Sequence, residues 1–386
     1  MKQKETRKTA RWDVWLLVCV LLVPAAYADI TPDGSLGTLV NQVGSDFDIS
    51  GGTRWDANLF HSFGVFDLNT GESATFQGPA DVMRILGRVT GGSASNLDGT
   101  LRSGISGADL YLINPAGIVF GPNASLEVSG SFHVTTADYL RLGNDGRFDA
   151  AIPANSVLTA AAPSAFGFVS AAPQPIEING SFLRTGDFST LSVIGGDVIL
   201  TDATLHAKEG RINMASVAEA GEVRPLAAGL DTGSFSSLGD IRITHSTDID
   251  GRPTGDNFGL PLGNVDVSGD GAGDVYIRSG NFYSDNGQVF SDTQGGGAAG
   301  SIDVNVSDEL KMVNEGRLIA DAFFFGGAGS DISVDAGHVV LESGSTISTL
   351  TGGTGDAGNV VVNASDSISA SGRSSDSDPR LLGNAR

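Results

Sequence analysis

Cysteine is almost absent from this sequence: Cys19 is the only one in 386 residues, and it lies close to the N-terminus. A long chain without disulfide bonds must be held together by its core and its hydrogen bonds. Proline is scarce, at 13 residues, whereas glycine, at 54, is about twice as frequent as usual. No Gly-X-Y period accompanies the glycine, which excludes collagen. The many Ile, Val, Leu and Phe residues exclude a disordered chain.

Positive charge is also in short supply. The chain has 23 Lys and Arg residues against 45 Asp and Glu residues. Without the five basic and two acidic residues of positions 1–28, 18 basic and 43 acidic residues remain, a net charge of −25. A surface this acidic repels nucleic acid and anionic lipid. We therefore expect neither as a partner.

Residues 1–28 have the three parts of a secretory signal peptide. A basic stretch from Lys2 to Arg11 precedes nine apolar residues from Trp15 to Val23. Ala26 and Ala28 then form a small-x-small site, so we expect cleavage after Ala28. The apolar run is shorter than the roughly 20 residues that span a bilayer, which favours a cleaved signal over an uncleaved anchor. The sequence thus predicts an exported protein.

The usual signatures of catalysis and metal binding are missing. The histidines are dispersed without metal-ligand spacing, at His61, His133, His206, His245 and His338. Asp248–Gly251 resembles a fragment of a calcium loop, but the other ligands and the closing Glu are absent. Gly269–Asp274 lacks the register of calcium-binding nonapeptides. We expect no catalytic residue, no metal site and no cofactor, and a protein that is not an enzyme.

Short alternating segments bounded by Gly, Asn, Asp or Ser fill the rest of the chain, and they predict an all-β protein. The clearest are Asp197–Thr201, Asp240–Thr244, Asn264–Ser268, Asp274–Arg278 and Ser301–Asn305. Near the C-terminus these strands repeat. The recurring apolar pairs are Ile302/Val304, Ile332/Val334 and Val360/Val362, at spacings of 30 and 28, and Leu310/Met312, Val339/Leu341 and Ile368/Ala370, at 29. Gly316, Gly344 and Gly372 follow at spacings of 28.

A fixed period of this length indicates stacked units that cannot bury an apolar face alone. With strands only, we expect a right-handed parallel β-helix, a solenoid in which each repeat of about 28–30 residues forms one coil over residues 166–373. A β-sandwich or propeller would need hairpin links of two to five residues. Residues 29–165 lack the clean repeat, and we expect them to form a cap and the first coils. Residues 374–386 are a polar tail.

Three sequence blocks, Arg54–Phe63, Ile85–Gly92 and Leu110–Gly121, follow one another in the predicted cap region. Together with Pro122–Phe132 they look like the haemagglutination-activity, or two-partner secretion, domain of filamentous haemagglutinin-like exoproteins. The resemblance covers about residues 30–145. It implies a signal-directed step across the inner membrane and docking to the periplasmic domains of an outer-membrane transporter of the Omp85 superfamily. The resemblance further implies that the chain passes out unfolded and winds into its β-helix at the cell surface of a Gram-negative-type bacterium.

Within the Leu110–Gly121 block, Asn114–Gly117 has the composition of a tight turn. Pro115 fixes φ at the second position, Gly117 suits the fourth, and Asn114 can bond the backbone. The family usually has a second Asn where this chain has Ala116. The resemblance makes the following residues candidates for transporter recognition: Asn58, Phe60, His61, Asn114, Pro115, Gly117, Phe120, Gly121 and Asn123.

The resemblance implies an adhesin or surface fibre whose ligand is a host-cell, carbohydrate or matrix component. The sequence is also compatible with two other functional interpretations. A parallel β-helix also houses polysaccharide lyases and hydrolases, because fold does not imply function, but no cluster of carboxylates with Arg or Lys emerges here. The chain could also be a fragment of a larger cytolysin or contact-dependent toxin.

Overall fold

A computed structural model describes residues 29–246, 252–254, 260–323 and 327–373. The predicted signal peptide with its cleavage after Ala28, the polar tail 374–386 and the calcium-loop fragment Asp248–Gly251 lie outside the described residues. Apart from the 3-10 helix η1 (Pro153–Asn155), the described residues form strands, turns and loops. None of the described helical segments has the length or apolar character needed to cross a membrane.

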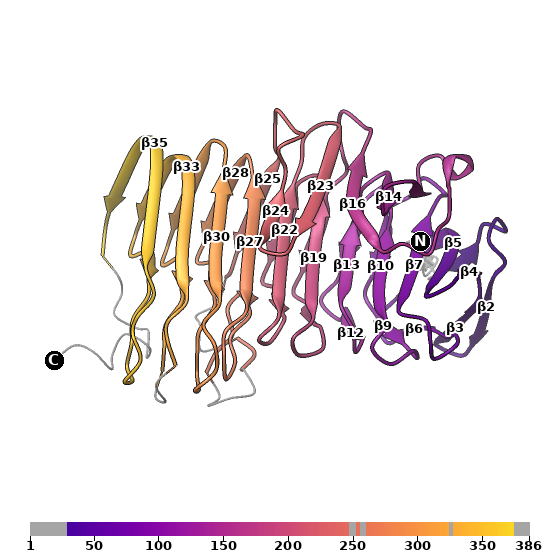
Figure 1. Ribbon diagram of the computed structural model, residues 1–386, viewed down its shortest axis with the longest axis horizontal. Helices are drawn as coiled ribbons and strands as arrows, with labels where there is room; N and C mark the ends of the chain where they lie inside the picture. The colour runs from indigo at the N-terminus through magenta and orange to yellow at the C-terminus, as the bar shows by residue number, and fades with distance from the viewer. Residues whose placement is uncertain (1–28, 247–251, 255–259, 324–326, 374–386) are drawn as a thin grey trace, which may run out of the picture.

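The chain winds into a parallel β-helix with three faces, and its coils stack along the long axis of the molecule (Figure 1). This confirms the predicted solenoid. Face 1 consists of β5 (Asn58–Phe66), β7 (Arg84–Val89), β10 (Asp109–Ile113), β13 (Phe132–Thr135), β19 (Thr190–Gly195), β22 (Arg211–Ser216), β27 (Asp274–Ser279), β30 (Ser301–Val306) and the first halves of β33 (Asp331–Glu342) and β35 (Val360–Ser371).

The second halves of β33 and β35 belong to face 2, so these two strands bend around the corner between the faces. Face 2 further contains β8 (Ser95–Leu97), β11 (Ile118–Phe120), β17 (Ile176–Asn179), β20 (Val198–Thr201), β25 (Asp240–Thr244), β28 (Asn281–Asp285) and β31 (Glu309–Val313). Face 3 contains β3 (Asp46–Gly51), β6 (Ser73–Phe76), β9 (Thr100–Ser103), β12 (Ser125–Glu127), β18 (Phe182–Arg184), β21 (Thr204–His206), β26 (Val265–Asp266), β29 (Gln288–Phe290), β32 (Arg317–Ile319) and β34 (Thr346–Ser348).

Columns of apolar residues fill the interior, because parallel pairing in register places like side chains above one another. One column on face 1 runs through the whole stack: Leu59, Ile85, Leu110, Phe132, Leu191, Ile212, Val275, Ile302, Ile332 and Val360. The pairs predicted from the repeat, such as Ile302 with Ile332, are register partners. The alternation of apolar and polar residues in the sequence thus predicts which side chains fill the interior.

The corner between faces 2 and 3 contains a column of left-handed residues, where glycine, Asn and Asp are favoured. Its members are Gly180 (φ 70°), Asp202 (φ 51°), Asn286 (φ 53°), Asn314 (φ 52°), Ser343 (φ 52°) and Gly372 (φ 101°). Gly316, Gly344 and Gly372, expected at equivalent positions, are not equivalent. The pairing of Leu341 with Ala370 places Gly372 opposite Ser343. Glycine spacing fails to mark the corner because Asn and Ser also occupy it.

Three antiparallel strands close the N-terminal end of the β-helix, as expected for a cap. β1 (Ile30–Pro32) and β4 (Thr53–Trp55) both pair with β5, and β2 (Thr38–Val43) pairs with β3. The outer edge of the first face-1 strand is therefore covered by the chain's own backbone.

A five-stranded antiparallel sheet, here called the cover sheet, leaves the β-helix and lies over the outer side of face 1 (Figure 1). Its strands are β14 (Tyr139–Leu142), β15 (Gly146–Asp149), β16 (Pro163–Phe168), β23 (Gly221–Leu226) and β24 (Gly229–Asp231). A second apolar core forms between them, and it reaches from Phe60 on β5 to Tyr276 on β27. The N-terminal coils are therefore buried on both sides of face 1.

Coil length is not uniform. Along the face-1 column the spacing is 21 residues from Leu191 to Ile212. From Val275 onward it is 27, 30 and 28 residues, ending at Val360. The repeat predicted for residues 166–373 thus describes the coils after Val275. The boundary at residue 165 stays a prediction.

Candidate functional site

The predicted turn Asn114–Gly117 connects β10 of face 1 to β11 of face 2. The Gly117 N–H donates to the Asn114 carbonyl over 3.1 Å, and the Ala116 N–H donates to Asn114 Oδ1 over 3.0 Å. Gly117 has φ of 111°, which a residue with a side chain rarely adopts. The tight turn and the backbone bond of the Asn side chain are therefore confirmed.

Asn114 also ties this coil to its neighbour. Its side chain is fully buried, and Nδ2 donates to the Ser93 carbonyl and to Ser95 Oγ, both over 3.0 Å. These bonds use both Nδ2 hydrogens, and the side chain has no exposed surface, so it is withheld from a partner once the coil is folded. Pro115 and Ala116 are half-buried and form the accessible part of the turn.

Asn58 and Phe60 lie on the outer side of face 1, beneath the cover sheet. Asn58 Nδ2 donates to the carbonyls of Thr159 and Ala161 over 2.9 and 2.8 Å, and it has no exposed surface. Phe60 packs on Phe148 of β15 with ring centroids 5.0 Å apart. Both candidates thus attach the loop and strands of the cover sheet to the first complete coil.

His61 points the other way, into the interior of the β-helix, opposite Gly87 of the next coil. It is fully buried, and within the described residues neither ring nitrogen has a hydrogen-bond partner. The rings of Phe63 and Phe76 lie 6.2 and 5.5 Å from it. Burial lowers the pKa of His61 to about 4, so the ring is neutral at physiological pH.

Phe120, Gly121 and Asn123 surround the next corner, between faces 2 and 3. Phe120 is 1% exposed and belongs to the interior core. Gly121 has no room for a Cβ because the Asp98 carboxylate occupies that position. Exposed Asn123 binds the same carboxylate, with Nδ2 3.0 Å from Asp98 Oδ2.

The nine candidates therefore do not form one surface. They are distributed between two corners, the interior and the space under the cover sheet, and each has a structural function there. Near the turn, a hollow of about 230 Å³ opens between Pro115, Ala116, Thr90 and Ala151. This hollow with the turn residues beside it, and the exposed Asn123 at the next corner, are the accessible parts of the candidate region.

Arg88, which was not among the candidates, is the central polar residue of the N-terminal region. It is 2% exposed and donates to Ser62 Oγ over 2.7 Å and to the Asp149 carbonyl over 2.6 Å. It also donates to Ser156 Oγ over 2.8 Å and to Ser35 Oγ over 3.1 Å. One guanidinium therefore joins the cap, face 1 and the cover sheet.

A sequence signal for this arrangement exists in the same strand. In Arg84–Val89, Ile85 points inward, so Leu86 and Arg88 must point outward. An outward Leu opposite outward Phe60 and Tyr111 indicates a face that is covered rather than solvated. Arg88 lies two residues after Leu86 in the same strand, so its side chain also points outward and lies beneath the cover sheet.

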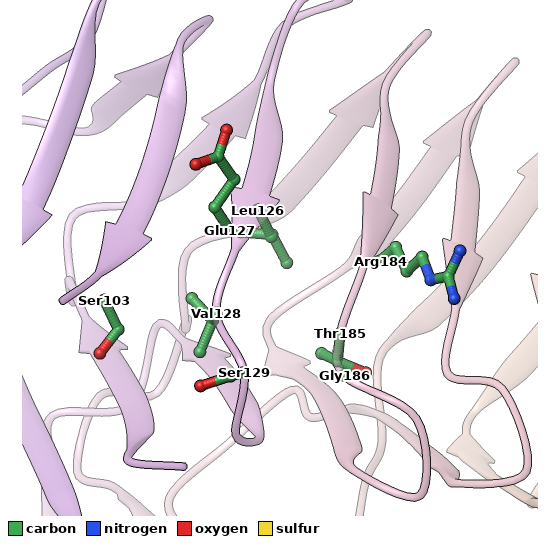
Figure 2. A pocket seen from close by; sticks show the side chains of 8 residues that line it. All are labelled: Ser103, Leu126, Glu127, Val128, Ser129, Arg184, Thr185 and Gly186. Atoms are coloured by element: carbon green, nitrogen blue, oxygen red, sulfur yellow. The ribbon is translucent and has the colours of Figure 1, made fainter. Parts of the chain in front are cut away.

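A second hollow of about 350 Å³ lies on face 3, where β12 and β18 are edges of two separate sheets (Figure 2). Its lining comprises Ser103, Leu126, Glu127, Val128, Ser129, Arg184, Thr185 and Gly186. Thr185 is 2% exposed, and its Oγ1 has no hydrogen-bond partner among the described residues. The lining thus combines hydroxyl groups and apolar side chains with two charged residues, Glu127, which binds Arg102, and Arg184, which binds Asp187.

This chain is similar to one protein family and to one curated relative. A family model described as the TPS secretion domain matches residues 28–277. The heme/hemopexin-binding protein of Haemophilus influenzae is 29% identical over 137 residues, and the match covers 34% of this chain and 14% of that protein. The chain therefore spans a small part of this relative's length.

Two solved structures are also similar. The filamentous hemagglutinin secretion domain has 15% sequence identity and a TM-score of 0.36, with 89% of this chain and 98% of that chain covered. The HMW1 secretion domain from Haemophilus influenzae has 16% identity and a TM-score of 0.42, with the same coverage of 89% and 98%.

Proposed function

The chain belongs to the TPS secretion domain family, and on this premise we propose that it is exported by a cognate outer-membrane transporter of the Omp85 superfamily. Residues 29–165 carry the recognition signal, and the chain winds into its β-helix outside the cell. The observation that carries this proposal is the extent of the family match, which runs through the cap, the covered coils and the cover sheet.

The architecture supports winding after export. Each coil of faces 1 and 2 pairs with the coil before it and the coil after it, so coils can be added one at a time. No cysteine lies beyond Cys19, so no disulfide can close a loop before the chain is threaded through a pore. Folding outside would then give export its direction without ATP.

The burial of the candidate residues bears on how recognition occurs. Asn58, Phe60 and Phe120 have at most 1% of their surface exposed once the coils close. A transporter can contact such side chains only before folding, whereas Pro115 and Ala116 remain accessible afterwards. We assign recognition to the unfolded motif segments. Ala116→Arg should then leave export unchanged, and loss of export in that variant would instead assign recognition to the folded turn.

For the exported protein we propose a binding function at the cell surface or in the medium, with a carbohydrate as the ligand class. The observation that favours it is the hollow between β12 and β18, whose lining contains hydroxyl groups together with Glu127 and Arg184 (Figure 2). Binding on a glycan array should fall in Thr185→Val and Glu127→Gln but not in Glu177→Gln on face 2. Equal binding by all variants would contradict this assignment.

The export proposal is tested by expressing the chain in a Gram-negative host with and without the co-expressed transporter. Protease added to intact cells should degrade the protein only when the transporter is present. Export without the transporter would overturn the proposal, as would a folded rod retained in the periplasm with the transporter present.

A further inference from the structure

β2 is the outermost strand at the N-terminal end of the molecule (Figure 1). It pairs with β3 through six consecutive residue pairs without a register shift. No strand of the described residues pairs with its other edge. Leu39 and Val43 are 63% and 65% exposed on it. β2 is therefore a regular, uncharged edge that is open to solvent and exposes two large apolar side chains.

The backbone groups at this edge follow from the ladder. Opposed residues of an antiparallel pair alternate between hydrogen-bonded and non-hydrogen-bonded positions. The Gly52 N–H donates to the Gly37 carbonyl over 3.0 Å. Gly37 and Gly52 are therefore a hydrogen-bonded pair, and every second pair along β2 and β3 is of the same kind. Asn41 and Asp48 are then a hydrogen-bonded pair, whereas Val40 and Gln42 direct their N–H and C=O groups away from β3.

The usual protections of an edge strand are missing here. Natural edges carry Lys, Pro, a bulge or an inward charge, or another element covers them. β2 has the sequence Thr-Leu-Val-Asn-Gln-Val, without charge or proline, and its pairing with β3 has no bulge. The adjacent edge of β5, by contrast, is covered by β1 and β4. The fold covers one edge of its first coil and leaves the other open.

The segment that contains β2 carries negative charge only. Residues 29–53 contain four Asp residues and no Lys or Arg. Asp46 and Asp48 are exposed on β3, directly opposite Val43 and Asn41. Arg102 approaches Asp46 to 3.8 Å from β9, and Ser73 Oγ also binds Asp46. Asp48 has no ion pair among the described residues. A strand placed beside β2 would meet an acidic neighbourhood.

We propose that β2 is a strand-addition site, which accepts an extended segment of another protein that carries Lys or Arg. Main-chain hydrogen bonds to Val40 and Gln42 would provide affinity, and the acidic surroundings would select the sequence. A second copy of this chain is disfavoured as the occupant, because each copy without residues 1–28 carries a formal charge of −25 and the same Asp residues at the contact.

The probe is a synthetic peptide of about eight residues, a usual strand length, that alternates Lys with Val. Its control has Glu in place of Lys. Fluorescence anisotropy of the labelled peptides measures binding to the purified chain, and sedimentation of the chain alone measures self-association. The Lys peptide should bind, and the Glu peptide should bind at least about tenfold more weakly.

Two variants test the edge itself. Gln42→Pro removes an outward N–H without touching the β2–β3 ladder, and Asn41→Lys adds a repulsive charge while keeping the backbone. Each should weaken binding of the Lys peptide by about tenfold or more, the loss expected for one or two hydrogen bonds or a like charge. Circular dichroism should show both variants folded.

Three results would overturn the proposal. They are equal binding of the two peptides, unchanged binding by a folded Asn41→Lys variant, and self-association of the wild-type chain that Asn41→Lys abolishes. The last result would make a second copy the occupant.

Discussion

The two ends of the β-helix share one interior and differ in their outer surface. In the N-terminal coils the outward column of face 1 begins with Phe60, Leu86 and Tyr111, all buried under the cover sheet. In the C-terminal coils the same column continues as Asp303, Ser333 and Val361, which lie beyond the cover. The inward column is aliphatic or aromatic throughout. The outward column therefore determines where the β-helix becomes a two-layered domain.

This difference also explains why the repeat is visible in only one region. The C-terminal coils contain few long excursions, so their register partners recur at nearly constant spacing. Between β13 and β17 the chain instead makes β14, β15 and β16, and between β22 and β25 it makes β23 and β24. An insertion within a coil removes the period without changing the stacking.

Substitution of Arg88 should produce the largest difference in stability between the N-terminal and the C-terminal coils. Arg88→Met removes the donor to acceptors on the cap, face 1 and the cover sheet, of which Ser62 and Asp149 are buried. It should lower the free energy of unfolding of the N-terminal region by roughly 3–5 kcal/mol. Trp55 is the only tryptophan beyond residue 28, so its fluorescence during denaturation reports on this region. Arg242→Met is the control, because that side chain is 54% exposed and should change stability by less than about 0.5 kcal/mol.

The second core should behave as a unit separate from the interior. Phe148→Ala removes the contact with Phe60 and should cost about 3–4 kcal/mol. Because Phe148 lies outside the β-helix interior, hydrogen exchange should rise in β5 and the cover sheet and stay unchanged in β30 and β33. Faster exchange along the whole rod would show that the two layers unfold together.

Acid should weaken the N-terminal region through His61 and His133. Burial lowers their pKa values to about 4 and about 3, below the usual 6.5, so the unfolded chain binds the protons more tightly. Their contribution is fully present above pH 6.5 and is lost as pH falls toward 4, by up to roughly 3 kcal/mol for His61.

Urea denaturation of wild type and of His61→Leu at pH 7 and pH 4.5 measures this contribution. The leucine variant should lose less stability on acidification than the wild type. The same loss in both proteins would assign the acid sensitivity to other groups.

The smallest expected effect concerns the left-handed corner column. Ser343 has φ of 52° where the next coil has Gly372, so Ser343→Gly should stabilise the C-terminal coils by about 0.5–1 kcal/mol. Ser333→Gly lies within β33, and there the same change should destabilise by a similar amount. Thermal unfolding of the two variants checks the opposite signs.

The alternation of apolar and polar residues and the repeat of about 28–30 residues predicted the strands and the pairing between neighbouring coils. Ile302 and Ile332 are register partners as expected, and Asn114–Gly117 forms the predicted turn. The outward Leu86 indicates a covered face, but the strands that form the cover sheet could not be predicted, because their contacts join distant residues. Asn58 binds the Thr159 carbonyl across 101 positions, and no local pattern encodes that pairing. The burial of Asn58 and Phe60 follows from contacts of the same kind.

The measurement that tests the account most directly compares two deletions of the chain in the presence of the transporter. Removing residues 29–165 should abolish export, whereas truncation after Ser279, just beyond the family match at residue 277, should leave export intact. Export is scored by protease access at the surface of intact cells. Export of the chain that lacks residues 29–165, or loss of export on truncation after Ser279, would contradict the assignment of recognition to the capped and covered N-terminal region.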